Sequence, residues 1–229
     1  MRMFSLSLVL TALVGGSIAV RGAEDVKLND VTLGQKPPEG ALVLMGGEAL
    51  DEWVRAGGKE PAPWPVADGV ATVKGGSIQT EKSFGDFQLH VEFNIPYMPK
   101  AHGQGRGNSG VYLDGAYELQ VLDSYGLKLK NNDCSAIYTQ IIPSVNACKP
   151  PLQWQTYDVT FHKAKVEDGK VARKARVTVV QNGVTIIDDK EISPTPGGAG
   201  TKEGEDGPIM LQDHGNPVQY RNLWIKPLN

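Results

Sequence analysis

The feature that most constrains this chain is a two-residue alternation of apolar and polar side chains, which recurs along much of its length. Residues 87–93 read Phe-Gln-Leu-His-Val-Glu-Phe without a break, and residues 156–162 repeat the pattern. Successive side chains of a strand point to opposite faces, so this period of two predicts strands with one buried face. The chain is therefore expected to build sheets rather than helices.

Turn signals separate further strand-like runs. Asn182-Gly183 divides the alternating residues of 176–189 and favours a two-residue hairpin turn. Asp114-Gly115 similarly divides 111–123, and we expect further strands at the segments 70–73, 209–212 and 218–226. The stretch 48–53 is the one place where we consider a helix.

The composition agrees with many short strands. The chain contains 27 Gly and 15 Pro among 229 residues, which suits a fold with many turns. We predict one all-β domain, a jelly-roll sandwich of two antiparallel sheets. The Gly- and Pro-rich loops at 94–107 and 193–208 are long enough to border a binding face.

The N-terminus has the pattern of a secretory signal peptide. Arg2 precedes an apolar run over 4–14 and then small residues, with cleavage sites possible after Ala19 or Ala23. A bilayer requires ~20 apolar residues, so the run is too short to span one. We predict a signal peptide at 1–23, a mature domain at 24–229 without a membrane span, and export to the periplasm or the medium. An uncleaved N-terminal anchor is the alternative.

Two cysteines, Cys134 and Cys148, follow the signal segment. An exported chain meets an oxidising compartment, so we predict a disulfide between them, with two free thiols as the alternative. A catalytic or metal-binding role is disfavoured because the chain has no Cys-x-x-Cys spacing.

The charge of the chain excludes some partners. The formal net charge is −3, and residues of both signs are interspersed. A strongly basic nucleic-acid binder is therefore excluded, and we expect no nucleic-acid partner. No pattern assigns an oligomeric state.

Polar side chains gather in 106–124 and again in 211–215. On strands, Glu118 and Gln120 share one face, as do Asn108, Gly110 and Tyr112. Gln212 and His214 would join them if the late strand continues that far. Carboxylate, amide and imidazole groups beside an aromatic ring are typical of sugar recognition. The candidate rings are Tyr112, Tyr138 and Trp154.

Each of these residues also has a plain structural interpretation. Glu118 would be a solvated residue on an exposed sheet face, and Asn108-Ser109-Gly110 and Asp123-Ser124 would be turns. His214 would mark a turn before Gly215. His90 and His162 are interpreted as surface residues of their strands.

Several further stretches form an ordered set of motifs: 85–93, 106–111, 117–124, 136–138, 154–158, the 182–183 hairpin, 207–215 and 220–225. Taken together, these motifs resemble the 3-keto-disaccharide hydrolase domain family, also described as 3-keto-glucoside 1,2-lyase/hydratase. The resemblance covers about residues 40–228, and the chain differs from the family at 44–50 and 139–148. The resemblance implies a concanavalin-like jelly roll with a concave polar face.

The resemblance also implies a reaction. A ketone at C3 of a sugar acidifies the hydrogen on C2, so a base can remove that proton and the group on C1 then leaves by β-elimination. Water adding back gives net hydrolysis. The predicted catalytic residues are Glu118 or His214 as the base, Arg106 as the enolate stabiliser and Asp123 as the orienting or protonating group.

Substrate binding is assigned to the remaining polar and aromatic candidates: Asn108, Ser109, Tyr112, Gln120, Tyr138, Trp154 and Gln212. The expected partner is a small 3-keto-glycoside. No cofactor is predicted, because the substrate already carries the ketone. A divalent cation held by Glu118, Asp123 or His214 is an alternative electrophile.

Two other function classes remain open at this point. A carbohydrate-binding module on the same fold needs no catalysis. A conventional glucanase needs two carboxylates facing each other across the bond, and Gln120 stands where the second acid would be expected.

Overall fold

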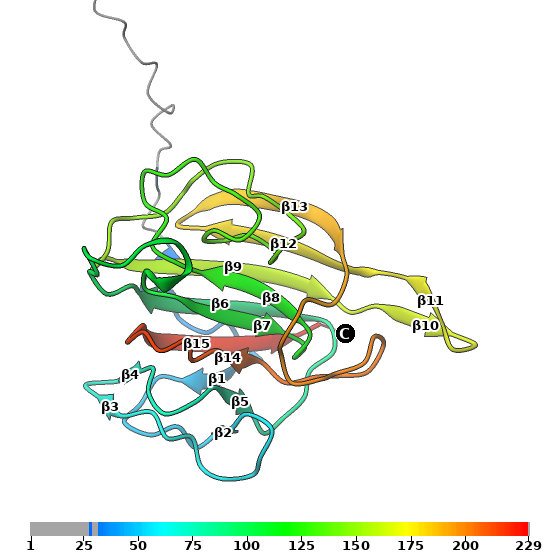
Figure 1. Ribbon diagram of the computed structural model, residues 1–229. Coiled ribbons are helices and arrows are strands. Elements are labelled where there is room, and N and C mark those ends of the chain that lie inside the picture. The colour runs from blue at the N-terminus through cyan, green and yellow to red at the C-terminus, as the bar shows by residue number, and fades with distance from the viewer. Residues whose placement is uncertain (1–27, 29–31, 229) are drawn as a thin grey trace, which may run out of the picture.

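The computed structural model describes residue 28 and residues 32–228. The chain forms two antiparallel sheets that pack against each other through one hydrophobic core (Figure 1). The predicted all-β sandwich is confirmed, and within the described residues the helical structure is limited to 3₁₀ turns such as η2 (Gly103–Gly105).

The larger sheet has eight strands. Across the sheet they are β13 (Val184–Ile192), β12 (Ala175–Gln181), β9 (Trp154–His162), β6 (Phe87–Asn94), β15 (Gln219–Pro227), β4 (Val70–Thr72) and β3 (Val66–Ala67), with β1 (Leu42–Met45) also paired to β15.

The smaller sheet has five strands. Across it they are β2 (Trp53–Arg55), β5 (Ile78–Thr80), β14 (Met210–Leu211), β7 (Ser109–Leu113) and β8 (Tyr117–Val121). The stretch 48–53, which was considered for a helix, forms a turn that leads into β2.

The period of two determines which side chains enter the core. Phe87 of β6 is completely buried and stacks on Phe161 of β9, with ring centroids 5.0 Å apart. Phe93 and Tyr157, farther along the same two strands, are 4.6 Å apart. Burying a side chain of this size contributes about 2–3 kcal/mol. These rings lie between the sheets, so the alternating polar residues face outward.

Two tyrosines of the larger sheet also reach across to the smaller one. The Tyr220 hydroxyl donates to Ser109 Oγ at 2.7 Å, and the Tyr157 hydroxyl donates to the Gln120 carbonyl at 2.8 Å. Buried polar groups must be paired, so these bonds fix β7 and β8 laterally against the larger sheet.

The predicted Asn182-Gly183 turn joins β12 to β13, with positive φ angles of 49° and 78°. The Asn182 side chain is buried, and its Nδ2 donates to the Ala147 carbonyl at 2.7 Å. The turn therefore also anchors the long connection that lies between β8 and β9.

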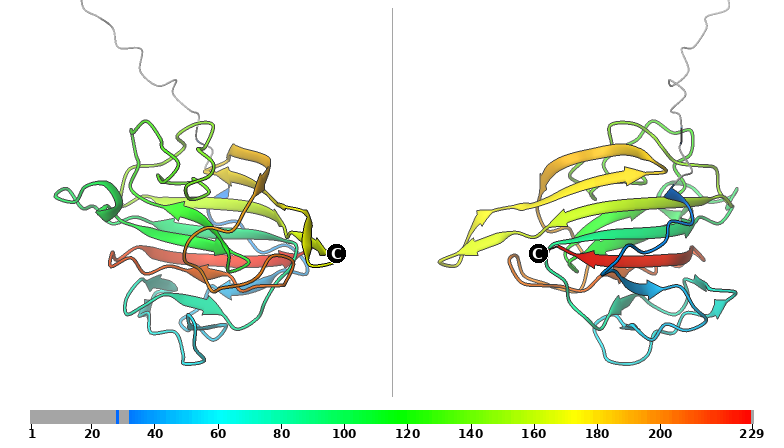
Figure 2. Two further views of the ribbon diagram at one scale, coloured as in Figure 1. Left: turned by 45° about the vertical axis from the view of Figure 1, so that its right-hand side comes forward. Right: turned by 180° about the vertical axis from the view of Figure 1, so that it is seen from behind.

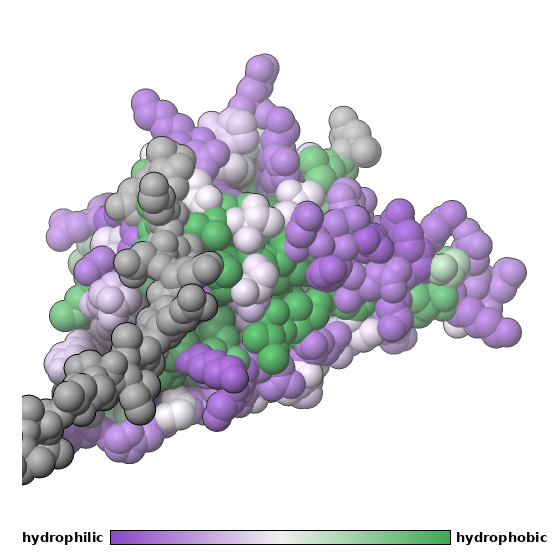
Figure 3. All heavy atoms as spheres, turned by 90° about the horizontal axis from the view of Figure 1, so that it is seen from above, coloured by the Kyte–Doolittle hydropathy of each residue, from purple (hydrophilic) through white to green (hydrophobic). Residues whose placement is uncertain are grey.

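A short hairpin, β10 (Lys165–Glu167) and β11 (Lys170–Arg173), extends from the end of the sandwich (Figure 2). Seen from above, hydrophilic side chains cover most of it (Figure 3). Its residues are exposed, and it was not among the strands predicted from the sequence.

The predicted disulfide between Cys134 and Cys148 is not formed in the structure. Cys134 and Cys148 are both buried free thiols. The Tyr157 hydroxyl lies 3.2 Å from Cys134 Sγ, and Gln181 Nε2 lies 3.6 Å from Cys148 Sγ. These buried polar side chains provide partners for both sulfur atoms, so the pair is accommodated without a covalent bond.

The predicted signal peptide, 1–23, lies outside the described residues. No helix within residue 28 and residues 32–228 is long and apolar enough to cross a membrane.

Candidate active site

The candidate site lies on the outward face of the five-stranded sheet. Tyr112 of β7 pairs with Glu118 of β8 on one side and with Met210 of β14 on the other. Directly opposed residues of neighbouring strands share a face. The alternate positions Val111 and Leu113 of β7 and Leu119 and Val121 of β8 belong to the hydrophobic core, so this register directs Glu118 and Tyr112 away from the core.

Glu118 is buried at this face, with 3% of its surface exposed. Its Oε2 accepts a hydrogen bond of 3.0 Å from the Tyr112 hydroxyl. The carboxylate lies across Gly110, where an added Cβ would come 2.6 Å from Glu118 Oε1. The missing side chain at Gly110 therefore provides the space that the carboxylate occupies.

Burial gives this carboxyl group an unusual acidity. Loss of contact with water raises the pKa of Glu118 to about 7, and the hydrogen bond from Tyr112 opposes this shift only in part. A carboxylate with a pKa near neutrality can accept a proton at physiological pH and hold it through the reaction.

Tyr112 links Glu118 to its neighbours. Gln212 Nε2 lies 3.4 Å from the Tyr112 hydroxyl, and the Pro196 carbonyl is a second acceptor for that hydroxyl at 3.1 Å. Burial and the adjacent Glu118 raise the pKa of Tyr112, so its hydroxyl stays protonated. The backbone of Gly197 lies so close to this hydroxyl that a Cβ added at Gly197 would lie 2.6 Å from the hydroxyl oxygen.

A hollow of about 460 Å³ opens beside this group. Arg55 is the cationic residue of its wall, and sequence reasoning missed it because it lies in a three-residue strand far from the polar motifs. Its Nη1 donates to the Gly75 carbonyl at 2.5 Å, and its Nε lies 3.3 Å from Glu60 Oε2. The other lining residues are Ala56, Gly76, Ser77, Tyr112, Gly197, Gly198, Met210, Gln212 and Asp213.

The structure holds the predicted residues Arg106 and Asp123 together but away from Glu118. Arg106 Nη2 donates to Asp123 Oδ2 at 2.6 Å, and the Asp123 peptide N–H donates to the Arg106 carbonyl. This pair lies just before β7 begins and just after β8 ends, whereas the Tyr112–Glu118 pair lies near their opposite ends.

His214 is exposed in the loop that follows β14. Its side chain makes no hydrogen bond or ion pair with the described residues. The loop itself is fixed near β7, because Asn216 Oδ1 accepts the peptide N–H of Asn108 at 2.8 Å. His214 therefore belongs to the same end of the sheet as Asn108.

The predicted amides Gln120 and Asn108 are covered by the loop that contains η2. Gln120 Nε2 donates to Gln104 Oε1 at 3.1 Å, and Asn108 Nδ2 donates to the Gln104 carbonyl at 2.7 Å. Gln104 was not identified from the sequence, because its position over the sheet depends on the loop conformation.

Two predicted binding residues face away from the site. Ser109 points into the core, where it donates to the Gln212 carbonyl and accepts from Tyr220. Trp154 begins β9 of the other sheet, and the Arg221 guanidinium stacks over its ring at 4.0 Å. The prediction that both residues lie in the groove was wrong. Ser109 lies on the core-facing side of β7, and Trp154 belongs to the opposite sheet. Tyr138 lies beside β8, where its peptide N–H donates to the Glu118 carbonyl.

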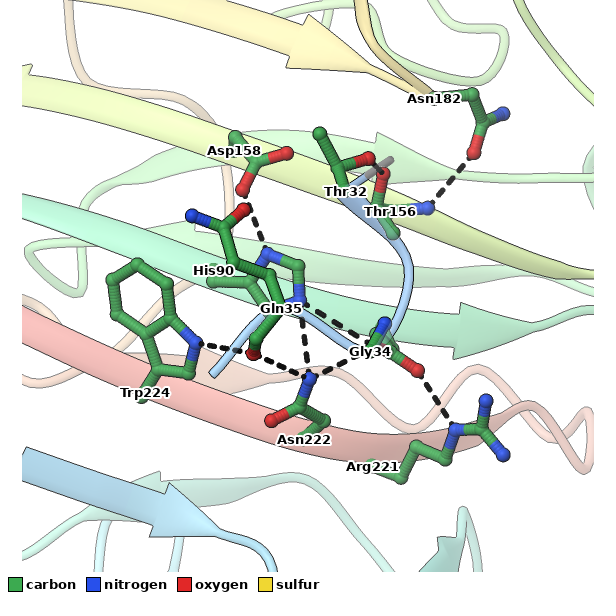
Figure 4. A network of polar contacts seen from close by, with 11 residues as sticks. Thr32, Gly34, Gln35, His90, Thr156, Asp158, Asn182, Arg221, Asn222 and Trp224 are labelled. Atoms are coloured by element: carbon green, nitrogen blue, oxygen red, sulfur yellow. Dashed lines mark hydrogen bonds and ion pairs between the residues drawn. The ribbon is translucent and has the colours of Figure 1, made fainter. Parts of the chain in front are cut away.

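A second polar cluster lies on the outer face of the larger sheet (Figure 4). His90, expected at the surface, is completely buried there, and its Nδ1 lies 2.7 Å from Asp158 Oδ1. The peptide N–H of Gly34 donates to Glu92 Oε1, so the segment before β1 covers the cluster. Burial lowers the pKa of His90, but Asp158 and Glu92 outweigh that effect and raise it. These contacts fasten the segment 32–35 to the sheet.

Potential metal ligands are dispersed. Among the residues that the structure describes, no three His, Cys, Asp or Glu side chains come together in a group that could hold a metal ion.

Comparisons with known proteins agree with the observed fold. A 3-keto-disaccharide hydrolase of Bacteroides thetaiotaomicron is 25% identical over 93% of this chain and 87% of its own length. The crystal structure of a predicted glycosyl hydrolase from Parabacteroides distasonis superimposes with a TM-score of 0.76 and 40% identity, over 83% of this chain and 85% of that one. A second such protein from the same organism, at 21% identity and a TM-score of 0.63, shares the fold.

The match to a protein family extends over almost all of the sandwich. Residues 40–226 match the family described as the 3-keto-alpha-glucoside-1,2-lyase-like domain. The chain therefore belongs to the 3-keto-alpha-glucoside-1,2-lyase-like family of carbohydrate-active proteins.

Proposed function

We propose that the protein cleaves 3-keto-glycosides by elimination, with Glu118 as the base. The Glu118 carboxylate takes the proton from C2, and the electron pair of that C–H bond moves onto the C3 ketone as an enolate. The ketone then re-forms, a C1=C2 double bond appears, and the C1–O bond breaks with its electron pair on the leaving oxygen, which takes a proton from solvent water. Glu118 then releases the proton from C2 to solvent. Water adding across the double bond returns a proton to C2 and completes a net hydrolysis.

The observation that carries the proposal is the buried Glu118 carboxyl group beside Tyr112. Its pKa of about 7 suits a base that works near neutral pH. The Tyr112 hydroxyl donates to Glu118 and lies at the wall of the hollow, so it can orient the carboxylate toward a bound sugar. This contact favours Glu118 over the exposed His214 as the base.

The enolate needs a positively charged or hydrogen-bonding partner. Arg55 lines the hollow with Gln212, where Glu60 and the Gly75 carbonyl hold its guanidinium, whereas Arg106 is held with Asp123 at the opposite end of β7 and β8. We therefore assign enolate stabilisation to Arg55, and hydroxyl binding to Gln212, whose buried Oε1 has no hydrogen-bond partner among the described residues.

The proposal needs no nicotinamide, since the substrate already carries the ketone. A divalent cation in place of Arg55 is the alternative, which removal of metal by a chelator tests. The proposal also includes export, which rests on Arg2 and the apolar run at 4–14.

Conventional glycoside hydrolysis is less well supported, because it needs a second free carboxylate near Glu118. Asp213 is the carboxylate in the wall of the hollow, and both of its oxygens accept peptide N–H groups, from Gly76 and from Gly215. It is therefore held as a structural acceptor.

The test is to incubate purified protein with a glucoside and with its 3-keto derivative, with and without chelator. We expect cleavage of the oxidised substrate alone and no effect of the chelator. Glu118→Gln should lower turnover more than tenfold. Binding without cleavage would instead identify a binding module, and cleavage of the unoxidised glucoside would identify a conventional hydrolase.

His214→Ala separates the two candidate bases. If Glu118 is the base, kcat of this variant should still rise as the pH increases through about 7, even if turnover is lower than in the unmodified protein. A variant that loses this rise, while Glu118→Gln keeps it, would transfer the role of base to His214.

A further inference from the structure

A second hollow, of about 520 Å³, lies at the base of the projecting hairpin. It shares no lining residue with the hollow beside Tyr112. Three cationic side chains line it, Lys163, Lys165 and Arg173, together with the carboxylates Asp86 and Asp206. The hairpin that supplies Lys165 and Arg173 extends away from the sandwich (Figures 1 and 2).

Both carboxylates of this hollow already have partners within the protein. Asp86 Oδ2 lies 2.8 Å from His162 Nδ1, and Asp86 Oδ1 accepts the peptide N–H of Lys163 at 3.0 Å. Asp206 Oδ1 accepts a hydrogen bond from Lys163 Nζ. One cation and both acids are thus accounted for, which leaves Lys165 and Arg173.

The register of the hairpin pairs these two cations across the strands, beyond a register shift that separates them from the other two pairs. The other two registered pairs are complementary, since Val166 faces Val171 and Glu167 faces Lys170. Lys165 pairs with Arg173, and like charges paired across two strands destabilise the strand pair.

The neutralisation of this pair is incomplete. Lys165 Nζ lies 2.7 Å from Glu167 Oε1 on its own strand. Arg173 is exposed and makes no side-chain hydrogen bond or ion pair with the described residues. The guanidinium is therefore available to a ligand, and an anion between the two cations would relieve their repulsion.

We propose that this hollow binds an anionic sugar, with its phosphate or carboxylate group between Lys165 and Arg173. A guanidinium binds such oxyanions through paired hydrogen bonds, and an ammonium adds a point charge. The hollow is larger than a single oxyanion needs, so the rest of it accommodates the sugar ring. This site is independent of the function proposed for Glu118.

Calorimetric titration in phosphate-free buffer of low ionic strength tests the site. The probes are glucose 6-phosphate, glucuronate, inorganic phosphate and glucose. We expect one or both anionic sugars to bind, inorganic phosphate to bind more weakly, and glucose not to bind. The two anionic sugars distinguish a phosphate from a carboxylate as the recognised group. Arg173→Gln should weaken the binding at least tenfold.

Lys174→Gln is the matched control, because it removes the same charge from the same segment but outside the hollow. The Lys174→Gln variant should bind the anionic sugar with the same affinity as the unmodified protein. The proposal is overturned if neither anionic sugar binds, if glucose binds equally well, or if inorganic phosphate binds as tightly as the sugars. An equal loss in Lys174→Gln would also overturn it, because the binding would then reflect general charge.

Hydrogen exchange of the hairpin amides provides a second readout. Without ligand, Arg173→Gln should slow exchange at Val166 and Val171, because the repulsion is removed. In the unmodified protein, the bound anionic sugar should slow exchange at the same amides. Exchange that responds to neither change would contradict the proposed pairing of the anion with Lys165 and Arg173.

Discussion

Glu118 is a deeply buried ionisable side chain, and its environment explains why its pKa is raised. The carboxylate lies over Gly110 and accepts one hydrogen bond, from Tyr112, so little replaces the water that it has lost. This arrangement favours the protonated form and raises the pKa of Glu118 to about 7.

The first prediction concerns the pH dependence of turnover. Only the deprotonated carboxylate can accept the C2 proton, so kcat/KM should rise as the pH increases through about 7 and then level off. The measurement is kcat/KM for a 3-keto-glucoside between pH 5 and pH 9. A rate that is flat across this range would argue against Glu118 as the base.

The second prediction concerns stability. The pKa of Glu118 is raised in the folded protein from an ordinary value of 4.5, so the fold loses stability as the pH rises from about 4.5 through about 7. Glu118→Gln removes this loss. We expect the variant to be more stable than the unmodified protein at pH 8.5, by on the order of 2 kcal/mol.

Urea unfolding of both proteins at pH 8.5 and at pH 4.5 measures this difference. The two proteins should be about equally stable at pH 4.5, where the Glu118 carboxyl group is already neutral. A stability difference that does not change with pH would show that the carboxylate is not penalised by burial.

The third prediction tests the space above Gly110. Gly110→Ala places a methyl group 2.6 Å from Glu118 Oε1 and should displace the carboxylate, lowering kcat more than tenfold. Gly47→Ala is the control, because nothing lies within 4 Å of its added Cβ. Circular dichroism checks that both variants fold, and full activity in a folded Gly110→Ala variant would contradict the assigned position of Glu118.

At the scale of elements, long alternating strands were predictable and short ones were not. The strands β6, β9 and β12 show the pattern over seven to nine residues, and the packing of β6 on β9 follows from it. By contrast, β2 and β3 contain three and two residues, too few to show a period. Their pairing depends on neighbouring strands, which explains why Arg55 was missed.

The alternation of side chains predicted which face of the smaller sheet carries the site, but it did not predict the loops that cover this face. Glu118, Gln120 and Tyr112 share the expected face because β7 and β8 are regular. The loops that place Gln104 and Gly197 over that face have no period, so their contacts were not predictable. The position of Trp154 was not predictable either, because the sequence around it indicates a strand but not the sheet to which that strand belongs.

The fourth prediction concerns the β12–β13 turn. Asn182 adopts a φ of 49°, its Oδ1 accepts the Thr156 peptide N–H, and its Nδ2 donates to the Ala147 carbonyl. Asn182→Ala strains the backbone and removes both bonds, so we expect a loss of about 2–4 kcal/mol in the free energy of unfolding.

Asn182→Asp is the matched variant. It tolerates the same backbone conformation and keeps the acceptor for Thr156, but it loses the bond to Ala147. Denaturant unfolding should therefore place it between the unmodified protein and Asn182→Ala. If Asn182→Ala were as stable as the unmodified protein, the turn would not anchor the connection between β8 and β9.

At the scale of the whole molecule, the two sheets have different roles. Part of the outer face of the larger sheet is covered by the segment 32–35, which is held through Glu92 and the buried His90 cluster. The outer face of the smaller sheet carries Glu118 and Tyr112 beside an open hollow. The core between them fixes the smaller sheet, so the carboxylate is positioned by strands, and loops complete its surroundings.

The reaction assigned to this assembly predicts the fate of one hydrogen atom. Elimination breaks the C2–H bond, whereas direct hydrolysis of the glycosidic bond leaves that hydrogen in place. The two mechanisms therefore give different products in heavy water, even where the same bond is cleaved.

The most direct test is to cleave a 3-keto-glucoside in D2O and examine C2 of the product by NMR. Free 3-keto sugar incubated without protein corrects for spontaneous exchange. The account predicts either a 1,2-unsaturated product without hydrogen on C2 or a hydrated product with deuterium there, and neither with Glu118→Gln. A free 3-keto sugar that retains its original C2 hydrogen would contradict it.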